Sequence, residues 1–247
     1  MGQKEKIIEL IQSEVSIPKI AKILNINKST IYYHYKKIKG KKYQKPTIPV
    51  DEQIVGEFLG IFAGDGSYHY EKKTCHYTIA IYLHAVDDKD YGDYVKNLIE
   101  RNFNKKVRTY QSKNLLTLVF YSKDIYNFIT QYLNIVPIKT YSVHLKNLES
   151  LSHDFLTAFV RGIFDTDGHH KYDGRLVICL ASKPMIDQIA LILNKLDIQN
   201  KIYVRNGPRQ HYELNIPRRE FSKYHKIIGF SNKRKECAGR DSNSRSF

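Results

Sequence analysis

A short glycine-containing segment occurs twice in this chain. The residues FLGIFAGDGS at 58–67 return as VRGIFDTDGH at 160–169, so that Asp65 and Asp167 lie 102 positions apart. Each copy is followed by the same succession of alternating and helix-periodic segments. The sequence therefore predicts one structural unit made twice, each copy with the order helix, two strands, helix, two strands, helix.

The first copy has more glycine than a helix tolerates on propensity alone. Gly56, Gly60 and Gly64 each cost about 1 kcal/mol relative to alanine inside a helix. Their four-residue spacing puts them on one ridge, where a second helix can approach backbone to backbone. The second copy has a matching ridge, made of Ala158, Gly162 and Thr166. We predict that the two helices pack along these ridges.

Such packing brings two acidic residues together at the C-terminal ends of the helices. Asp65 and Asp167 are each followed by a glycine, Gly66 or Gly168, which we expect to end the helix in the left-handed conformation. Two carboxylates repel each other and are disfavoured beside a negative helix end. A single Asp-Gly pair is most simply a turn. Paired copies on matched ridges instead favour a divalent cation held between the carboxylates.

The charge of the chain is strongly positive. Forty Lys and Arg face twenty-five Asp and Glu, a formal net charge of +15, and eleven Lys with three Glu lie in residues 1–45. This surplus favours a polyanionic partner, and by itself leaves ribosomal, membrane-surface and nucleic-acid roles open. The sequence has no apolar run long enough to span a membrane and no signal peptide, so we expect an intracellular protein, in the cytoplasm, nucleoid or organelle matrix, without a membrane partner.

Residues 1–45 form a separate predicted domain. Apolar residues recur at helical spacing in three short stretches, and Asn25 stands where a tight turn needs a left-handed residue. The stretch IPKIAKILNINKSTIYYHYKKI resembles the helix-turn-helix of DNA-binding regulators, and a basic three-helix packing module is the alternative. In the first interpretation the DNA contacts are Lys28, Ser29, Thr30, Tyr33 and His34.

Residues 50–236 resemble the LAGLIDADG homing endonucleases of the single-chain, two-motif kind. The nine motif positions are matched by residues 58–66 and 160–168. The resemblance implies that the eighth position, Asp65 or Asp167, binds metal, and that Gly64 and Thr166 complete the metal site. The first copy departs from the motif at its sixth position, where Ala63 replaces the acid that the second copy has as Asp165.

The family's fold supplies the expected architecture. It implies an α+β protein with pseudo-twofold tandem αββαββα repeats, whose saddle-shaped antiparallel sheets follow the DNA major groove. The small all-α domain precedes these repeats in the sequence. The predicted parts are residues 1–45, the repeats 46–147 and 148–236, and a disordered tail, 237–247. The predicted groove-facing residues are Tyr82, His84, Arg108, Tyr110, Arg175, Lys201, Tyr203, Arg205 and Arg209.

The resemblance also implies an activity. We expect a monomeric, site-specific endonuclease that cuts both strands of a long asymmetric DNA target and supports intron or intein mobility. Two or three Mg²⁺ ions would serve it, with Mn²⁺ as a substitute and Ca²⁺ supporting binding only. The expected catalytic lysines are Lys139 and Lys233, with Lys235 less favoured, and His69, His169 and His170 are second choices as acid or base.

Three alternatives to this activity come from the binding class of proteins. The same fold could belong to a DNA-binding regulator or an RNA maturase that no longer cleaves. A basic structural protein that binds nucleic acid is the third, but it leaves the repeat unexplained. The presence of both Asp65 and Asp167 favours the nuclease, because a protein that only binds has no use for a repulsive acidic pair.

Overall fold

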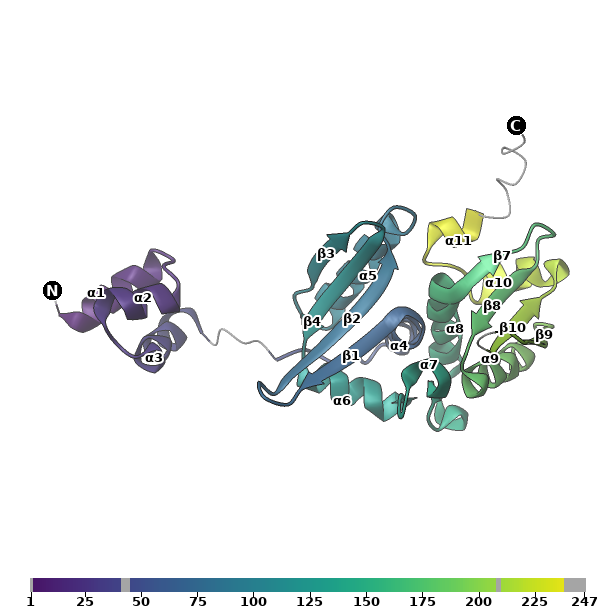
Figure 1. The fold of residues 1–247 in the computed structure, drawn as a ribbon, viewed down its shortest axis with the longest axis horizontal. Coiled ribbons are helices and arrows are strands. Elements are labelled where there is room, and N and C mark those ends of the chain that lie inside the picture. Colours follow the sequence, from purple (N-terminus) through teal and green to yellow (C-terminus); the bar gives the residue numbers. More distant parts are fainter. Residues whose placement is uncertain (1, 41–44, 208–209, 238–247) are drawn as a thin grey trace, which may run out of the picture. The chain divides into compact units, whose positions relative to one another are not determined.

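The computed structural model of the chain describes residues 2–40, 45–207 and 210–237. The chain divides into two compact units, Met1–Lys45 and Pro46–Phe247 (Figure 1). Of the expected tail, residues 238–247 lie outside the described residues, and Cys237 is the last residue of a helix. No helix in the described part of the chain is both long enough and apolar enough to cross a membrane.

The first unit consists of three helices, as the sequence predicts. They are α1 (Gln3–Gln12), α2 (Ile17–Leu24) and α3 (Lys28–Lys39). Their apolar positions form a small core of their own, made of Ile7, Ile11, Ile20 and Ile31, each at most 2% exposed. Between α2 and α3, Asn25 adopts the left-handed conformation at φ +52°, which confirms the expectation for this turn.

The second unit contains the two predicted repeats in the same element order. The first repeat comprises α4 (Glu52–Asp65), β1 (Gly66–Glu71), β2 (His76–His84), α5 (Lys89–Asn102), β3 (Arg108–Ser112), β4 (Leu115–Tyr121) and α6 (Lys123–Tyr132). The second comprises α8 (His153–Asp167), β7 (Gly168–His170), β8 (Leu176–Leu180), α9 (Lys183–Lys195), β9 (Lys201–Arg205), β10 (His211–Ile216) and α10 (Phe221–Ile227). The α+β prediction is therefore confirmed.

Several short elements connect or follow the repeats, and the sequence did not indicate them. They are β5 (Leu133–Asn134), α7 (Lys139–Ser142), β6 (His144–Leu145), the 3₁₀ turns Leu148–Ser150 and Arg218–Glu220, and α11 (Lys233–Cys237). Their lengths of two to five residues are too short to show a hydrophobic period. Two of these elements, α7 and α11, carry lysines of the candidate site.

Each repeat forms one antiparallel sheet of four strands. The strand order is β1-β2-β4-β3 in the first sheet and β7-β8-β10-β9 in the second. One face of each sheet is covered by helices, so Ile79, Ile81 and Leu83 are at most 4% exposed. On the opposite face of β2, Tyr82 is 42% exposed. The alternation in the sequence therefore assigns the two faces of this strand correctly.

Helices α4 and α8 lie side by side between the two sheets (Figure 1). A Cβ atom on Gly60 would lie 2.2 Å from the carbonyl oxygen of Phe159, and one on Gly162 would lie 2.5 Å from that of Glu57. Gly56 is as tightly placed, 2.2 Å from the carbonyl oxygen of Phe155. The absent side chains thus permit the close approach that the glycine spacing predicts.

The helix ends differ from the prediction in one respect. Gly66 and Gly168 have φ −83° and −82°, which is extended backbone rather than the expected left-handed conformation. The reason is that each helix continues directly into a strand. A Cβ atom on Gly66 would lie 2.4 Å from the carbonyl oxygen of Phe62 in the last helical turn. Glycine is needed here for space, and not for a positive φ.

Candidate active site

The two motif acids meet at the end of the α4–α8 interface. A Cβ atom on Gly64 would lie 2.5 Å from Oδ2 of Asp167, so the carboxylate of the second repeat rests against the backbone of the first. Burial, together with the charge of Asp167, raises the pKa of Asp65 to about 7. Burial also raises the pKa of Asp167 to about 6. The pair is therefore electrostatically strained without a cation.

A lysine lies beside each end of the acidic pair: Lys139 is half-buried and Lys235 is buried. The ammonium of Lys139, on α7, donates a hydrogen bond to the carbonyl oxygen of Gly64 at 2.7 Å. The ammonium of Lys235, on α11, donates to the carbonyl oxygen of Thr166 at 3.3 Å and to that of Gly168. Gly64 and Thr166 are the same position of the two motif copies, so the lysines are equivalent under the repeat.

Burial shifts the pKa of both lysines downwards. The pKa of Lys139 is lowered to about 8, although the charges of Asp167 and Asp65 act to raise it. The pKa of Lys235 is lowered by burial and by the charge of Arg234. With a pKa of about 8, Lys139 can give up or take a proton close to neutral pH, which a surface lysine cannot.

The structure places Lys235 at the site, where the sequence analysis favoured Lys233. Lys235 is 8% exposed, whereas Lys233 is exposed on the opposite side of the same helix. The reason is helical geometry, because residues two positions apart on a helix point about 200° apart. Only the existence of α11, which is five residues long, distinguishes the two lysines.

The donor set fits a hard divalent cation. The two carboxylates lie close enough for the charge of Asp167 to act on Asp65, and oxygen ligands are those that Mg²⁺ prefers, whereas the carbonyl oxygens of Gly64 and Thr166 accept hydrogen bonds from the two lysines. Within the described ranges, no group of three or more His, Cys, Asp or Glu side chains could hold a metal ion. The protein thus offers two acidic side chains, and water and phosphate oxygens would supply the remaining ligands.

The three histidines near the motifs have different surroundings. His170 packs among the rings of Phe164, Phe221 and Phe230, and its Nε2 is buried without a hydrogen-bond partner. The ring is half-buried, and this aromatic packing points to a structural role. His69 is exposed on β1, and His169 is half-buried on β7, where burial lowers its pKa.

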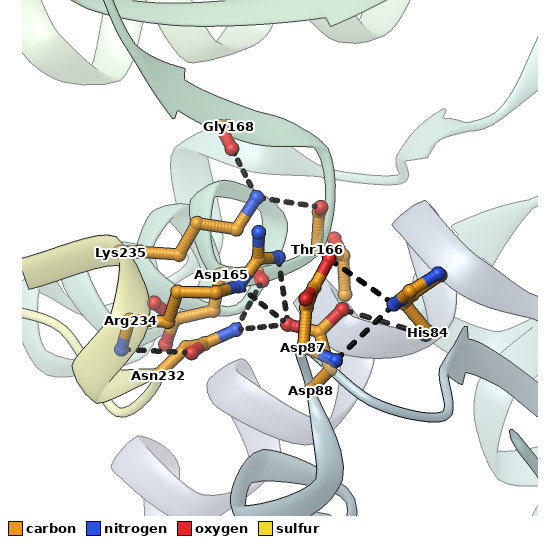
Figure 2. A network of polar contacts seen from close by, with 9 residues as sticks. All are labelled: His84, Asp87, Asp88, Asp165, Thr166, Gly168, Asn232, Arg234 and Lys235. Atoms are coloured by element: carbon orange, nitrogen blue, oxygen red, sulfur yellow. Dashed lines mark hydrogen bonds and ion pairs between the residues drawn. The ribbon is translucent and has the colours of Figure 1, made fainter. Parts of the chain in front are cut away.

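A polar network that the sequence does not indicate lies beside the site (Figure 2). It joins the loop before α5 in the first repeat to the segment that carries Lys235. Its central residue is Asp88, whose Oδ1 accepts hydrogen bonds from Asn232 and Arg234. These residues are more than 140 positions apart, so no local pattern could have joined them.

The first sheet carries four of the residues predicted to contact DNA, on strands β2 and β3. Tyr82 and Tyr110 both lie opposite Thr117 in the strand register, and they are 42% and 51% exposed. Arg108 is exposed and stacks 5.5 Å from the ring centre of Tyr121. His84 ends β2, where its Nδ1 lies 3.1 Å from the Asp87 carboxylate.

The second sheet presents a charged network on the equivalent face. Glu213 is 6% exposed, and its carboxylate accepts hydrogen bonds from Arg205 and Asn215, both at 2.9 Å. The bond from Arg205 is the main cause that lowers the pKa of Glu213 to about 2. Lys201 and Tyr203 are exposed on β9, Arg175 bonds Asp173 and Asn215, and Arg209 lies outside the described residues.

In the first unit, the start of α3 is exposed. The side chains of Lys28, Ser29, Thr30 and Tyr33 are exposed there, and His34 is half-buried. Lys37 lies 4.5 Å from the ring centre of Tyr33, which adds a second cation to this surface. Ile31 anchors the same turns in the core of the unit, while the exposed side chains around it leave an outer face open, as a recognition helix requires.

Comparison with known proteins identifies the fold. Residues 154–229 match the family model described as a LAGLIDADG-like domain. The structure of I-DmoI in complex with DNA and Ca superposes with a TM-score of 0.58 at 21% identity, covering 73% of this chain and 92% of that one. The structure of the homing endonuclease I-WcaI bound to its DNA recognition sequence superposes with a TM-score of 0.52 at 12% identity, covering 85% of this chain and 92% of that one. The chain has the LAGLIDADG fold, with two motif copies in one chain.

The curated relatives are archaeal. An uncharacterized protein of Methanocaldococcus jannaschii is 26% identical over 196 residues, or 72% of this chain and 66% of that protein. A probable translation initiation factor IF-2 of the same organism is 25% identical over 240 residues, 92% of this chain but 19% of the factor. The DNA-directed RNA polymerase subunit Rpo1C of Methanocaldococcus jannaschii is 25% identical over 207 residues, which are 81% of this chain and 22% of the subunit. The chain thus spans under two thirds of the first relative and under a quarter of the others.

Proposed function

We propose that this chain is a site-specific DNA endonuclease that cuts both strands, with Mg²⁺ held by Asp65 and Asp167. The observation that carries the proposal is the acidic pair, half-buried across the α4–α8 interface, with half-buried Lys139 and buried Lys235 beside it. Such a pair is costly to a fold that uses no cation. A protein that only binds DNA gains nothing from it, which separates the nuclease from a regulator or an RNA maturase on the same fold.

The acids and the lysines of the site have different proposed roles in cleavage. Bound divalent cations supply an activated water and neutralise the charge on the phosphate. Asp65 and Asp167 hold them, Mn²⁺ can substitute, and Ca²⁺ supports binding without cleavage. Lys139 and Lys235 place positive charge beside the scissile phosphates, where each can steady a phosphate oxygen or exchange a proton with the departing group. Because the repeats are equivalent, each lysine serves one DNA strand.

The exposed sheet faces provide the DNA contacts. Tyr82, Arg108 and Tyr110 from one sheet and Lys201, Tyr203 and Arg205 from the other would read the major groove. The two sheets carry different residues, which supports a monomer on a long asymmetric double-stranded target. The basic start of α3 would add contacts on one flank as a helix-turn-helix.

The relatives support a mobile element. Similar segments occupy 19% of an initiation factor and 22% of a polymerase subunit, two proteins of different function. An endonuclease that cuts a gene at one site and is copied into the break would be found inside unrelated proteins in this way. We therefore propose intron or intein mobility as the role, inside the cell where DNA is available.

Cleavage is tested with a plasmid that carries the uninterrupted sequence flanking the gene of this chain. We expect Mg²⁺ to convert the supercoiled plasmid to linear DNA with one break in each strand and short 3′ overhangs, and Ca²⁺ to leave it intact but bound. A plasmid bound in Mg²⁺ and never cut would favour the regulator or maturase instead.

A further inference from the structure

The segment after α10 of the second repeat is hydrogen-bonded to the first repeat. Asp88, which precedes α5, is 9% exposed, and its Oδ1 accepts hydrogen bonds from Asn232 Nδ2 at 3.0 Å and from Arg234 at 2.7 and 3.1 Å (Figure 2). One carboxylate therefore holds two residues of the other repeat. Hydrogen bonds to a charged acceptor are the stronger kind.

The same segment is also hydrogen-bonded to α8, through the acid at the sixth motif position of the second copy, which the first copy lacks. Asp165 is 2% exposed, its Oδ2 accepts from the amide of Ser231 at 2.8 Å, and its carbonyl oxygen accepts from Asn232 Nδ2 at 3.2 Å. The equivalent residue of the first copy is Ala63. The acid at the sixth motif position thus has a structural partner here that explains why only the second copy needs it.

These bonds fix the start of α11. Asn232 precedes the helix, and its carbonyl oxygen accepts from the amide of Lys235 at 2.9 Å. Lys235 then reaches the carbonyl oxygens of Thr166 and Gly168. A five-residue helix has too few internal bonds to be stable alone, so its position depends on what holds its first residues.

The lysine of the first repeat is held in a related way. Lys139 opens α7, and Val143 closes it with a hydrogen bond from its amide to the carbonyl oxygen of Lys139 at 2.9 Å. The hydroxyl of Ser182 donates to the carbonyl oxygen of Val143 at 2.6 Å, and Ser182 is 1% exposed. Ser182 precedes α9, as Asp88 precedes α5, and these two helices are equivalent in the repeats.

We propose that Asp88 and Ser182 are positioning residues for the two site lysines, and that each acts on the lysine carried by the other repeat. Neither residue touches the acids or the proposed DNA. Each anchors the short helix that presents an ammonium to the motif carbonyls. As a result neither lysine is in place unless both repeats are correctly packed, which links the two cutting centres to a single assembled fold. The catalytic part of this inference rests on the proposed function.

Lysine labelling tests the positioning without any need for cleavage. The intact protein is treated briefly with acetic anhydride, and each lysine is followed by mass spectrometry. Asp88→Asn should raise the reactivity of Lys235 at least fivefold and leave Lys139 unchanged. Ser182→Ala should do the reverse. Lys233, exposed on the same short helix as Lys235, is the internal reference for general loosening.

A control variant and a second test variant are measured in the same labelling experiment. Asp187→Asn removes another ion pair, with Lys183 on α9, and should change neither site lysine. Asp88→Asn also removes a charge that raises the pKa of Lys235, which by itself would increase labelling. Arg234→Gln breaks the same contact from a residue that is 44% exposed and removes a charge that lowers the pKa of Lys235, so increased labelling of Lys235 in this variant reports movement. Equal changes at Lys139 and Lys235, or no change at either, would overturn the proposal.

Strand-specific kinetics then test the catalytic consequence. Asp88→Asn should slow the cutting of one strand about tenfold, so that nicked plasmid accumulates, and Ser182→Ala should slow the other. In a Lys235→Met background, Asp88→Asn should cause no further loss, because its effect passes through that lysine. Additive losses would mean a merely structural role. If the wild-type protein does not cut, the proposed function fails, while the labelling result still decides the positioning.

Discussion

Gly64 of the first repeat and Asp167 of the second are in contact across the α4–α8 interface. A Cβ atom on Gly64 would lie 2.5 Å from Oδ2 of Asp167 and 2.1 Å from Oγ1 of Thr166. These two oxygens belong to side chains that can rotate, although Cβ of Thr166 also lies 2.9 Å away, whereas a Cβ on Gly60 would meet the backbone of α8. The same substitution at these two glycines should therefore have different effects.

Gly64→Ala should displace the Asp167 carboxylate more than it destabilises the fold. We expect cleavage to fall at least tenfold and the free energy of unfolding to fall by about 1 kcal/mol. Gly60→Ala should cost about 2 to 3 kcal/mol, because the α8 backbone cannot yield. Urea unfolding and plasmid cleavage measure the two effects. A Gly64→Ala protein as active as the wild type would remove this glycine from the site.

The acidic pair predicts an unusual pH dependence of stability. Burial holds the pKa of Asp65, at about 7, above its value in the unfolded chain. The folded state then binds the proton more tightly, so the stability from this group is complete below about pH 4 and is lost as the pH rises through 7. Asp65→Asn cannot ionise and should be about 2 kcal/mol more stable than the wild type at pH 8, with equal stability at pH 4.

Thermal unfolding measures this difference, which amounts to roughly 4 to 8 °C in Tm for a protein of this size. Saturating Mg²⁺ should stabilise the wild-type protein at pH 8 and have little effect on Asp65→Asn. Asp187→Asn serves as the control, since it removes an exposed carboxylate. If Asp65→Asn lowered the Tm at pH 8, the acid would be stabilising the fold and the strain argument would be wrong.

Glu213 predicts a change in DNA discrimination. Its carboxylate holds Arg205 at 2.9 Å and lies 3.6 Å from the Lys171 ammonium, so it orients cations on the exposed face of the second sheet. Glu213→Gln should reduce the preference for target over random DNA about tenfold, because a freed arginine contacts any phosphate. Competition binding in Ca²⁺ measures this ratio. An unchanged ratio would place Glu213 outside DNA recognition.

The first unit predicts a change in salt dependence. It carries eleven of the lysines, and each lysine that neutralises a phosphate steepens the fall of affinity with salt. A chain of residues 46–247 should bind the target with a shallower slope of log affinity against log salt than the full chain. Identical slopes would mean that residues 1–45 do not meet DNA.

The sequence predicted those parts of the site that have a local pattern. Glycines four residues apart indicated the α4–α8 ridge, and the paired Asp65 and Asp167 followed from it. The extended conformation of Gly66 was missed because an Asp-Gly pair looks the same before a turn and before a strand. Lys235 was ranked below Lys233 because α11 has no signal of its own. The Asp88 contacts join residues that only the folded repeats bring together.

Metal-dependent cleavage by the wild-type protein and the two acid variants tests the central claim most directly. Asp65→Ala and Asp167→Ala are incubated with the target plasmid in Mg²⁺, and their binding is measured in Ca²⁺. We predict that the wild type linearises the plasmid, and that each variant loses cleavage while it retains binding within about threefold. Cleavage by either variant at the wild-type rate would contradict a metal site shared by Asp65 and Asp167.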